Sequence, residues 1–132
     1  MKKILLIEDT AIYLRVLHQA LIDFGYEVIL PPTVDPNHFD WSYMPTKEEM
    51  VEFLKSIDPD CVLLDIHLGC SYTGWDLLEH FNNNHTICIS SEFEVQGIPT
   101  WKDKGELTYS PDSDRYNRSA WDLAELIQSR IR

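Results

Sequence analysis

The stretch CVLLDIHLGC, from Cys61 to Cys70, decides how the rest of the chain is interpreted. It opens with a short apolar run, Cys61–Leu64, which is typical of a strand buried on both faces of a sheet. The run ends at Asp65, and a carboxylate is costly to bury without a partner. We therefore expect Asp65 either to reach solvent at the tip of the strand or to lie where its charge is needed.

Three other apolar runs share the character of Cys61–Leu64. They are KKILLIED (Lys2–Asp9), YEVIL (Tyr26–Leu30) and TICIS (Thr86–Ser90). Segments with apolar residues at helical spacing separate or follow these runs, and they begin TAIYLRVLHQ, TKEEMVEFLK, TGWDLLEHF and NRSAWDLAEL. Strands that alternate with helices predict an α/β fold, with a mostly parallel sheet and right-handed crossovers.

Length and composition favour a single soluble domain that covers residues 1–132. The formal net charge of −11 argues against nucleic-acid partners and against anionic membrane surfaces. The sequence has neither an apolar run long enough to cross a membrane nor the pattern of a signal peptide. The three cysteines are an odd number, and two of them lie in strand-like runs, so we expect reduced thiols and a cytoplasmic protein.

A segment rich in proline, Pro31–Pro45, follows the second apolar run and carries Phe39, Trp41 and Tyr43. It predicts a long ordered loop between that strand and the next helix. Its aromatic side chains either cover an exposed edge of the core or form a surface on which a partner docks.

Acidic residues end two of the predicted strands. Glu8 and Asp9 end the first run, and Asp65 ends the third. Ligands of open parallel sheets bind beyond the carboxyl ends of the strands, so adjacent strands would bring these three carboxylates into one crevice. Their repulsion would raise their pKa values, and a hard divalent cation such as Mg²⁺ would relieve it. Taken singly, Asp9 or Thr10 could instead cap the following helix.

The order of these residues along the chain resembles the response-regulator receiver domain of two-component signalling. The matching stretches are ILLIED, CVLLDIHLGCSYTGWDLL, ICISS and GIPTWKDKGEL, and they span essentially the whole chain. The resemblance implies a flavodoxin-like, doubly wound sheet of five parallel strands in the order 2-1-3-4-5.

The resemblance also implies a role for each matching residue. Asp65 matches the aspartate that accepts the phosphoryl group, and Asp9 matches the acid that binds Mg²⁺ directly. Glu8 matches its neighbour, which holds the metal directly or through water. His67 occupies the position whose backbone carbonyl completes the metal site. Asp65 itself is expected to be the remaining metal ligand.

Three further matches concern the phosphoryl group and its readout. Ser90 matches the hydroxyl residue that binds the phosphoryl group, and Lys104 matches the lysine that pairs with its oxygens. Trp101 falls at an aromatic position whose rotamer often reports activation. The implied partners are a sensor histidine kinase or a phosphotransfer protein, together with a downstream protein target that the sequence does not name.

One part of the chain departs from the family pattern. Only 13 residues separate Ser90 from Lys104, and the crossover Ser91–Gly97 is too short for a full helix. We therefore expect the family's fourth helix to be reduced or lost. An alternative fifth strand, Glu106–Ser110, would lengthen the crossover but leave no lysine after it. Lys102 is the second candidate for the lysine role.

Three other functions are alternatives to the phospho-acceptor hypothesis. A pseudo-receiver would keep the fold and bind partners without phosphorylation, and the missing helix favours it. A small metal-dependent phosphatase commonly needs a second acid two residues after its nucleophilic aspartate, and that position holds His67. A nucleotide-binding protein is disfavoured because no glycine-rich loop follows the first strand.

Overall fold

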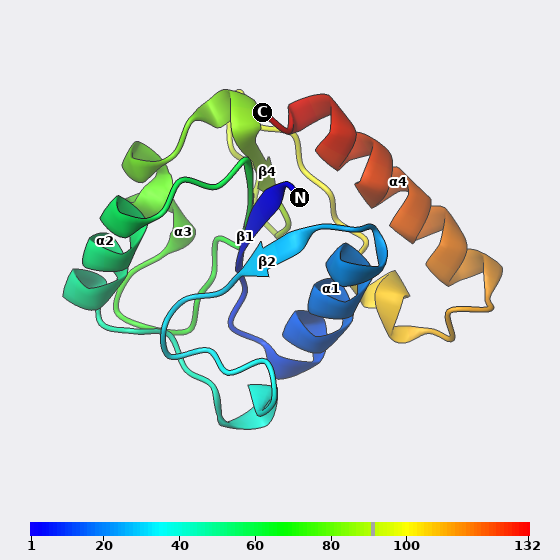
Figure 1. Cartoon of the computed structure of the whole chain (residues 1–132), viewed down its shortest axis with the longest axis horizontal. Coiled ribbons are helices and arrows are strands. Elements are labelled where there is room, and N and C mark those ends of the chain that lie inside the picture. Colours follow the sequence, from blue (N-terminus) through cyan, green and yellow to red (C-terminus); the bar gives the residue numbers. More distant parts are fainter. Residues whose placement is uncertain (91) are drawn as a thin grey trace.

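Four parallel strands form the sheet, in the order β2-β1-β3-β4 (Figure 1). They are β1 (Lys3–Ile7), β2 (Glu27–Ile29), β3 (Cys61–Leu64) and β4 (Thr86–Cys88). This computed structural model describes residues 1–90 and 92–132. The predicted α/β class, the parallel sheet and the order of its first four strands are confirmed.

Helices cover both faces of the sheet, as a doubly wound fold requires. Helices α1 (Ala11–Asp23) and α4 (Asp114–Arg130) lie on one face, and α2 (Lys47–Ser56) and the short α3 (Gly74–Leu77) lie on the other (Figure 1). Successive strand residues point to alternate faces, which is why these strands are apolar throughout. The two core layers thus leave only the ends of the strands available for polar groups.

The helix boundaries follow local signals in the sequence. Thr46 and Glu49 form a capping box at the start of α2, in which each side chain accepts from the other residue's backbone N–H. Gly25 adopts a left-handed φ of 94° just after α1, and its N–H donates to the carbonyl of Ile22 at 2.9 Å. The capping box thus marks the start of α2, and Gly25 marks the end of α1.

The prediction of a fifth strand is wrong for the residues that the structure describes. Thr100 makes one isolated parallel bridge with Cys88, through hydrogen bonds of 2.9 Å and 2.8 Å. The next bond toward the N-terminus would need an N–H at Pro99, which proline lacks. On the other side the chain turns into a 3₁₀-helix, η4 (Lys104–Thr108). The bridge lies where GIPTWK was expected, and the alternative strand Glu106–Ser110 falls largely within η4.

The crossover after β4 contains no helix in its described part. Residues 92–99 run as irregular chain with one turn, at which Gly97 has a φ of 82°. Ser91, the first residue of the predicted crossover, lies outside the described residues. The expected loss of the fourth helix therefore holds for residues 92–99, and α4 is the last helix of the chain.

The long loop after β2 is partly folded against α1. It contains a short 3₁₀-helix, η1 (Phe39–Trp41), in which Phe39 is buried. Trp41 and Tyr43 are 83 % and 68 % exposed, so only one of the three aromatic side chains covers the core. Asp40 pairs with Arg15 of α1 at 3.2 Å.

Two more 3₁₀-helices, η2 (Leu78–His80) and η3 (Asn83–His85), connect α3 to β4. Among the residues that the structure describes, no helix combines the length and apolar character needed to cross a bilayer.

Candidate functional site

The carboxyl ends of β1 and β3 meet at the edge of the sheet away from both chain termini. A cleft of about 220 Å³ opens there, beside Ser90, which lies two residues after the end of β4. The residues that line the cleft are Asp9, Thr10, Tyr13, Asp65, His67, Ser90, Glu92 and Lys104. Five of the six predicted site residues are among them, and the sixth, Glu8, lies buried directly behind Lys104.

Three acids come together at this edge. Glu8, Asp9 and Asp65 each offer a carboxylate oxygen, and these oxygens all lie within 4.8 Å of one another. Oxygen ligands at this spacing fit a hard divalent cation, which needs few protein carboxylates. In the described part of the chain, no other group of three histidine, cysteine or acidic side chains converges in this way. The cluster can therefore bind a metal ion.

Glu8 has a structural task in addition to its place in the cluster. Its side chain is fully buried, and Oε2 accepts the backbone N–H groups of Asp9 and Thr10 at 3.1 Å each. Thr10 makes no side-chain cap at the start of α1, so the turn that enters the helix is held by Glu8 instead. Burial, followed by the charge of Asp65, raises the pKa of Glu8 to about 8 despite the nearby ammonium of Lys104.

Lys104 supplies the buried positive charge of the site. Its Nζ lies 2.5 Å from Oε1 of Glu8 and 3.5 Å from Oδ2 of Asp65. Burial acts to lower the pKa of Lys104, but the two carboxylates outweigh burial and raise it. Lys102, the other candidate, has a half-exposed side chain that pairs with Glu94 at 2.8 Å. The structure thus brings Lys104, and not Lys102, to Asp65.

Asp65 is 5 % exposed, so it is not a solvated charge at the tip of a strand. Burial raises its pKa, and the charge of Lys104 opposes that shift. Its backbone N–H donates to the carbonyl of Ile7 at 2.9 Å, which continues the pairing of β3 with β1 beyond the assigned strands. The carboxyl group at the end of this apolar strand therefore meets a lysine that favours its charged form, whereas burial and the charge of Asp9 oppose that form.

Gly74, the first residue of α3, packs against the backbone of Asp65 and Ile66. Its N–H donates to the carbonyl of Ile66 at 2.8 Å. A Cβ at position 74 would lie 2.4 Å from the carbonyl oxygen of Asp65 and 2.8 Å from Cα of Ile66. Only glycine allows this close approach of α3 to the backbone of the site.

Gly74→Ala is expected to destabilise the protein by about 2 kcal/mol, because the methyl group meets backbone atoms that cannot turn aside. Urea denaturation at neutral pH would measure this change. Gly105→Ala is the matched control, since a Cβ there meets nothing within 4 Å. Equal stability of the Gly74 and Gly105 variants would contradict the close approach.

Ser90 is buried beside the acids, and its Oγ accepts the N–H groups of Glu92 and Phe93, both at 3.3 Å. Because the oxygen accepts both bonds, the hydroxyl hydrogen is left to donate into the cleft. His67 and Glu92 are exposed at the rim.

Tyr13 is a cleft residue that the sequence reasoning treated only as part of a helix face. The Nζ of Lys104 lies 4.8 Å from the centre of its ring. Tyr13 follows Asp9 by four residues, which is about one helical turn. This spacing was the feature of the sequence that could have placed Tyr13 beside the acids.

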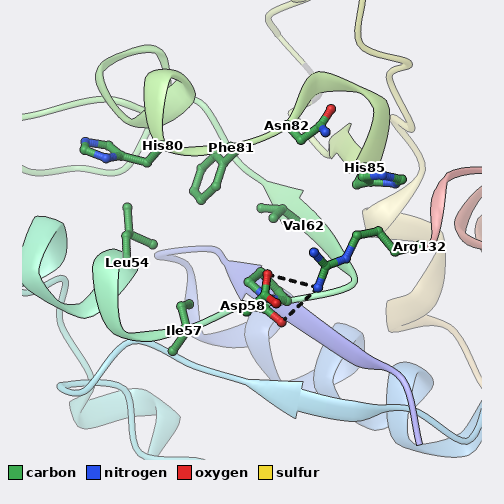
Figure 2. A pocket seen from close by; sticks show the side chains of 10 residues that line it. Leu54, Ile57, Asp58, Val62, His80, Phe81, Asn82, His85 and Arg132 are labelled. Carbon is green, nitrogen blue, oxygen red and sulfur yellow. Dashed lines mark hydrogen bonds and ion pairs between the residues drawn. The ribbon is translucent and has the colours of Figure 1, made fainter.

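A second cleft, of about 240 Å³, lies at the opposite edge of the sheet (Figure 2). Leu54, Val62 and Phe81 form its apolar part, and Arg132 pairs across it with Asp58 at 2.9 Å. None of the predicted site residues lies in this cleft.

No family model and no curated protein matches the chain. Solved structures do match it. One is the N-terminal domain of a response regulator/sensory box/GGDEF three-domain protein from Carboxydothermus hydrogenoformans, at 18 % identity, 93 % coverage of each chain and a TM-score of 0.54. The fold is that of a response-regulator receiver domain.

Two other solved structures are similar in fold to this chain. A sensor protein from Polaromonas sp. JS666 is 16 % identical, with coverage of 92 % of this chain and 98 % of that one, and a TM-score of 0.52. A fusion that carries the trimeric coiled coil of yeast Spc42 is 18 % identical, with coverage of 98 % and 74 % and a TM-score of 0.57. At these identities the likeness concerns the fold, and the roles of site residues rest on their geometry.

Proposed function

We propose that the chain is a phospho-accepting receiver, in which Asp65 takes a phosphoryl group from a histidine kinase or a phosphotransfer protein. The observation that carries the proposal is the position of Asp65. Its carboxylate lines the cleft, lies 3.5 Å from a buried lysine and belongs to a cluster with two more acids. Structural relatives that include a response-regulator domain support a signalling role for this fold.

In the proposed reaction, a carboxylate oxygen of Asp65 attacks phosphorus in line with the leaving nitrogen of a phosphohistidine. A P–O bond forms and the P–N bond breaks, and the electron pair stays on the imidazole, which takes up a proton. The product is an acyl phosphate. The ammonium of Lys104 offsets negative charge on the transferring group, so catalysis consists mainly of positioning and electrostatics.

Glu8, Asp9 and Asp65 would hold Mg²⁺, with the backbone carbonyl of His67 as the proposed further ligand. The ion would supply charge neutralisation for the phosphoryl oxygens. The hydroxyl of Ser90 would donate a hydrogen bond to one phosphoryl oxygen. The acidic composition and the three free thiols favour a cytoplasmic protein that signals by protein contact, without nucleic-acid or membrane partners.

Incubation with acetyl phosphate and Mg²⁺ tests the proposal without a cognate kinase. We expect the intact mass to rise by one phosphoryl group, with acetate as the leaving group, and we expect EDTA to prevent the change. A protein that binds Mg²⁺ but gains no phosphoryl group would favour the pseudo-receiver. Steady release of phosphate over many turnovers would instead indicate a phosphatase.

A further inference from the structure

The backbone of Lys104 is not held in a strand. The nearest sheet pairing is the single bridge at Thr100, and Lys104 opens η4. The direction of its side chain therefore depends on the groups around Nζ. These are the carboxylates of Glu8 and Asp65 and the ring of Tyr13.

The two carboxylates do not attract the ammonium to the same place. Glu8 is the nearer, at 2.5 Å, and lies behind the cleft, whereas Asp65 lines the cleft. The pull of Glu8 on the ammonium is therefore directed away from the cleft, and that of Asp65 toward it. The half-buried ring of Tyr13 lines the same cleft, and α1 packs against η4, so the ring is a fixed third neighbour.

We propose that Tyr13 is a positioning residue, whose ring face keeps the Lys104 ammonium at the cleft, within reach of the group transferred to Asp65. This inference rests on the proposed function. An aromatic face attracts a cation without taking its charge into an ion pair. When Glu8 and Asp65 share their charge with a bound metal, the ring would remain as a partner of Lys104.

Leucine and phenylalanine at position 13 separate this role from packing. Phenylalanine keeps the ring face, whereas leucine keeps an apolar side chain without it. We expect Tyr13→Phe to be labelled by acetyl phosphate within about two-fold of the wild-type rate, and Tyr13→Leu to be about three- to ten-fold slower. Tyr109→Leu is the matched control, because Tyr109 lies 4.1 Å from the Arg115 guanidinium and outside the cleft. We expect it to leave the rate unchanged.

A second measurement needs neither metal nor phosphoryl transfer. In EDTA, Tyr13→Leu should unfold at a lower urea concentration than Tyr13→Phe. This gap should close when both are combined with Lys104→Met, since the ammonium is then gone. A gap that persists without the lysine would overturn the contact.

The two failures can be told apart. If the wild type is labelled and Tyr13→Leu is labelled as fast as Tyr13→Phe, the inference is wrong and the proposed function stands. If the wild type is not labelled at all, the proposed function fails, and the unfolding comparison still decides whether Tyr13 holds Lys104.

A separate set of contacts connects the site to an exposed aromatic pair. The N–H of Phe93 donates to Ser90, and its ring packs edge-on against Trp75, with ring centres 4.9 Å apart and an angle of 72°. Trp75 is 46 % exposed and directly follows Gly74, which packs against the backbone of Asp65. The pair is thus connected to Ser90 through Phe93 and is adjacent in sequence to Gly74, which lies against Asp65.

The geometry points to the Trp75–Phe93 pair as the surface that changes when the phosphoryl site is filled, which also rests on the proposed function. If Ser90 turns toward a phosphoryl oxygen, the two N–H groups that it accepts must follow or lose their bond. Either outcome moves Phe93 relative to Trp75. With no helix in residues 92–99, this movement reaches the surface within a few residues of Ser90.

Chains with a single tryptophan test this route. One chain keeps Trp75 and replaces the other three tryptophans by phenylalanine, and the control keeps Trp121, which is exposed on α4. On addition of beryllofluoride and Mg²⁺, we expect the emission of the Trp75 chain to shift and that of the Trp121 chain to stay constant. Ser90→Ala should remove the shift.

Phe93→Leu in the chain with all four tryptophans provides a second variant, and we expect it to lose the Trp75 part of the response. Fluorine NMR reports beryllofluoride binding independently. Bound beryllofluoride with silent Trp75 emission would overturn the inference alone, whereas absence of binding to the wild type would count against the proposed function.

Discussion

Glu8→Gln is expected to make the metal-free protein more stable at pH 7, although it removes a residue of the site. The pKa of Glu8 rises from 4.5 to about 8 on folding, chiefly because the group is buried. A carboxyl group with a raised pKa lets the folded state keep its proton, so stability is highest below pH 4.5 and falls as the pH rises toward 8. Glutamine keeps the shape but does not titrate.

The stability difference between Glu8→Gln and wild type should therefore grow with pH. It should be smallest near pH 4.5 and increase with pH, reaching on the order of a few kcal/mol at pH 7. Urea denaturation in EDTA at several pH values would measure it. Glu52→Gln, at an exposed position on α2, should show no such trend.

Mg²⁺ should make the wild type more stable relative to Glu8→Gln. A metal that binds the folded state stabilises it, and its ligands must be deprotonated. Wild type should therefore gain stability on addition of Mg²⁺, whereas Glu8→Gln should gain little. A Glu8→Gln protein that is less stable than wild type in EDTA at pH 7, but not at pH 5, would contradict the burial argument.

Lys104→Met should lower the stability of the metal-free protein, whereas Glu8→Gln should raise it. Lys104→Met leaves the buried Asp65 carboxylate, and Glu8 at pH values where it is ionised, without their cation, and removal of one partner from a buried ion pair costs about 3 kcal/mol or more. The loss should shrink at acidic pH, where both carboxyl groups accept protons. Without the lysine their pKa values rise further, so the stability of the variant should keep falling at pH values above 8.

The same substitution should slow labelling by acetyl phosphate on the order of a hundred-fold, because a charge aimed at the transferring group is lost. Lys102→Met is the matched control. Its exposed pair with Glu94 is screened by solvent and contributes little to stability, and Lys102 does not line the cleft. Faster labelling by Lys104→Met than by Lys102→Met would show that the lysine role had been given to the wrong residue.

The sheet could be predicted because its strands are buried on both faces. Such strands need apolar residues at every position, and the runs that end at Leu64 and Ile7 meet this need without help from distant contacts. The meeting of Asp65 with Glu8 and Asp9 then followed from the rule that parallel strands end at one edge.

The fifth strand was predicted wrongly because the prediction used the apolar character of the run and not the number of backbone N–H groups available for pairing. Trp101 and Ile98 are buried as a strand would require, but Pro99 cannot donate the bond that would extend the pairing.

The conformation of the loop Pro31–Pro45 was harder to predict. Its aromatic residues follow neither helical nor strand periodicity, so burial of Phe39 and exposure of Trp41 depend on contacts with α1 that the pattern does not contain.

Within the site, the sequence indicated which charges meet but not how they are held. Glu8 was expected to serve a metal, and its bonds to the backbone of Asp9 and Thr10 were not foreseen. Tyr13 was missed because an aromatic residue at helical spacing is more often part of the core. Both depend on side-chain directions at the first turn of α1, which become visible only in the folded chain.

The central claim is that Asp65 accepts the phosphoryl group, and mapping the labelled residue tests it most directly. After incubation with acetyl phosphate and Mg²⁺, reduction with borohydride and peptide mass spectrometry identify the modified residue. We expect the label at Asp65 alone, and we expect Asp65→Asn to take up none. A label on His67 or on another residue, or undiminished labelling of Asp65→Asn, would contradict the claim.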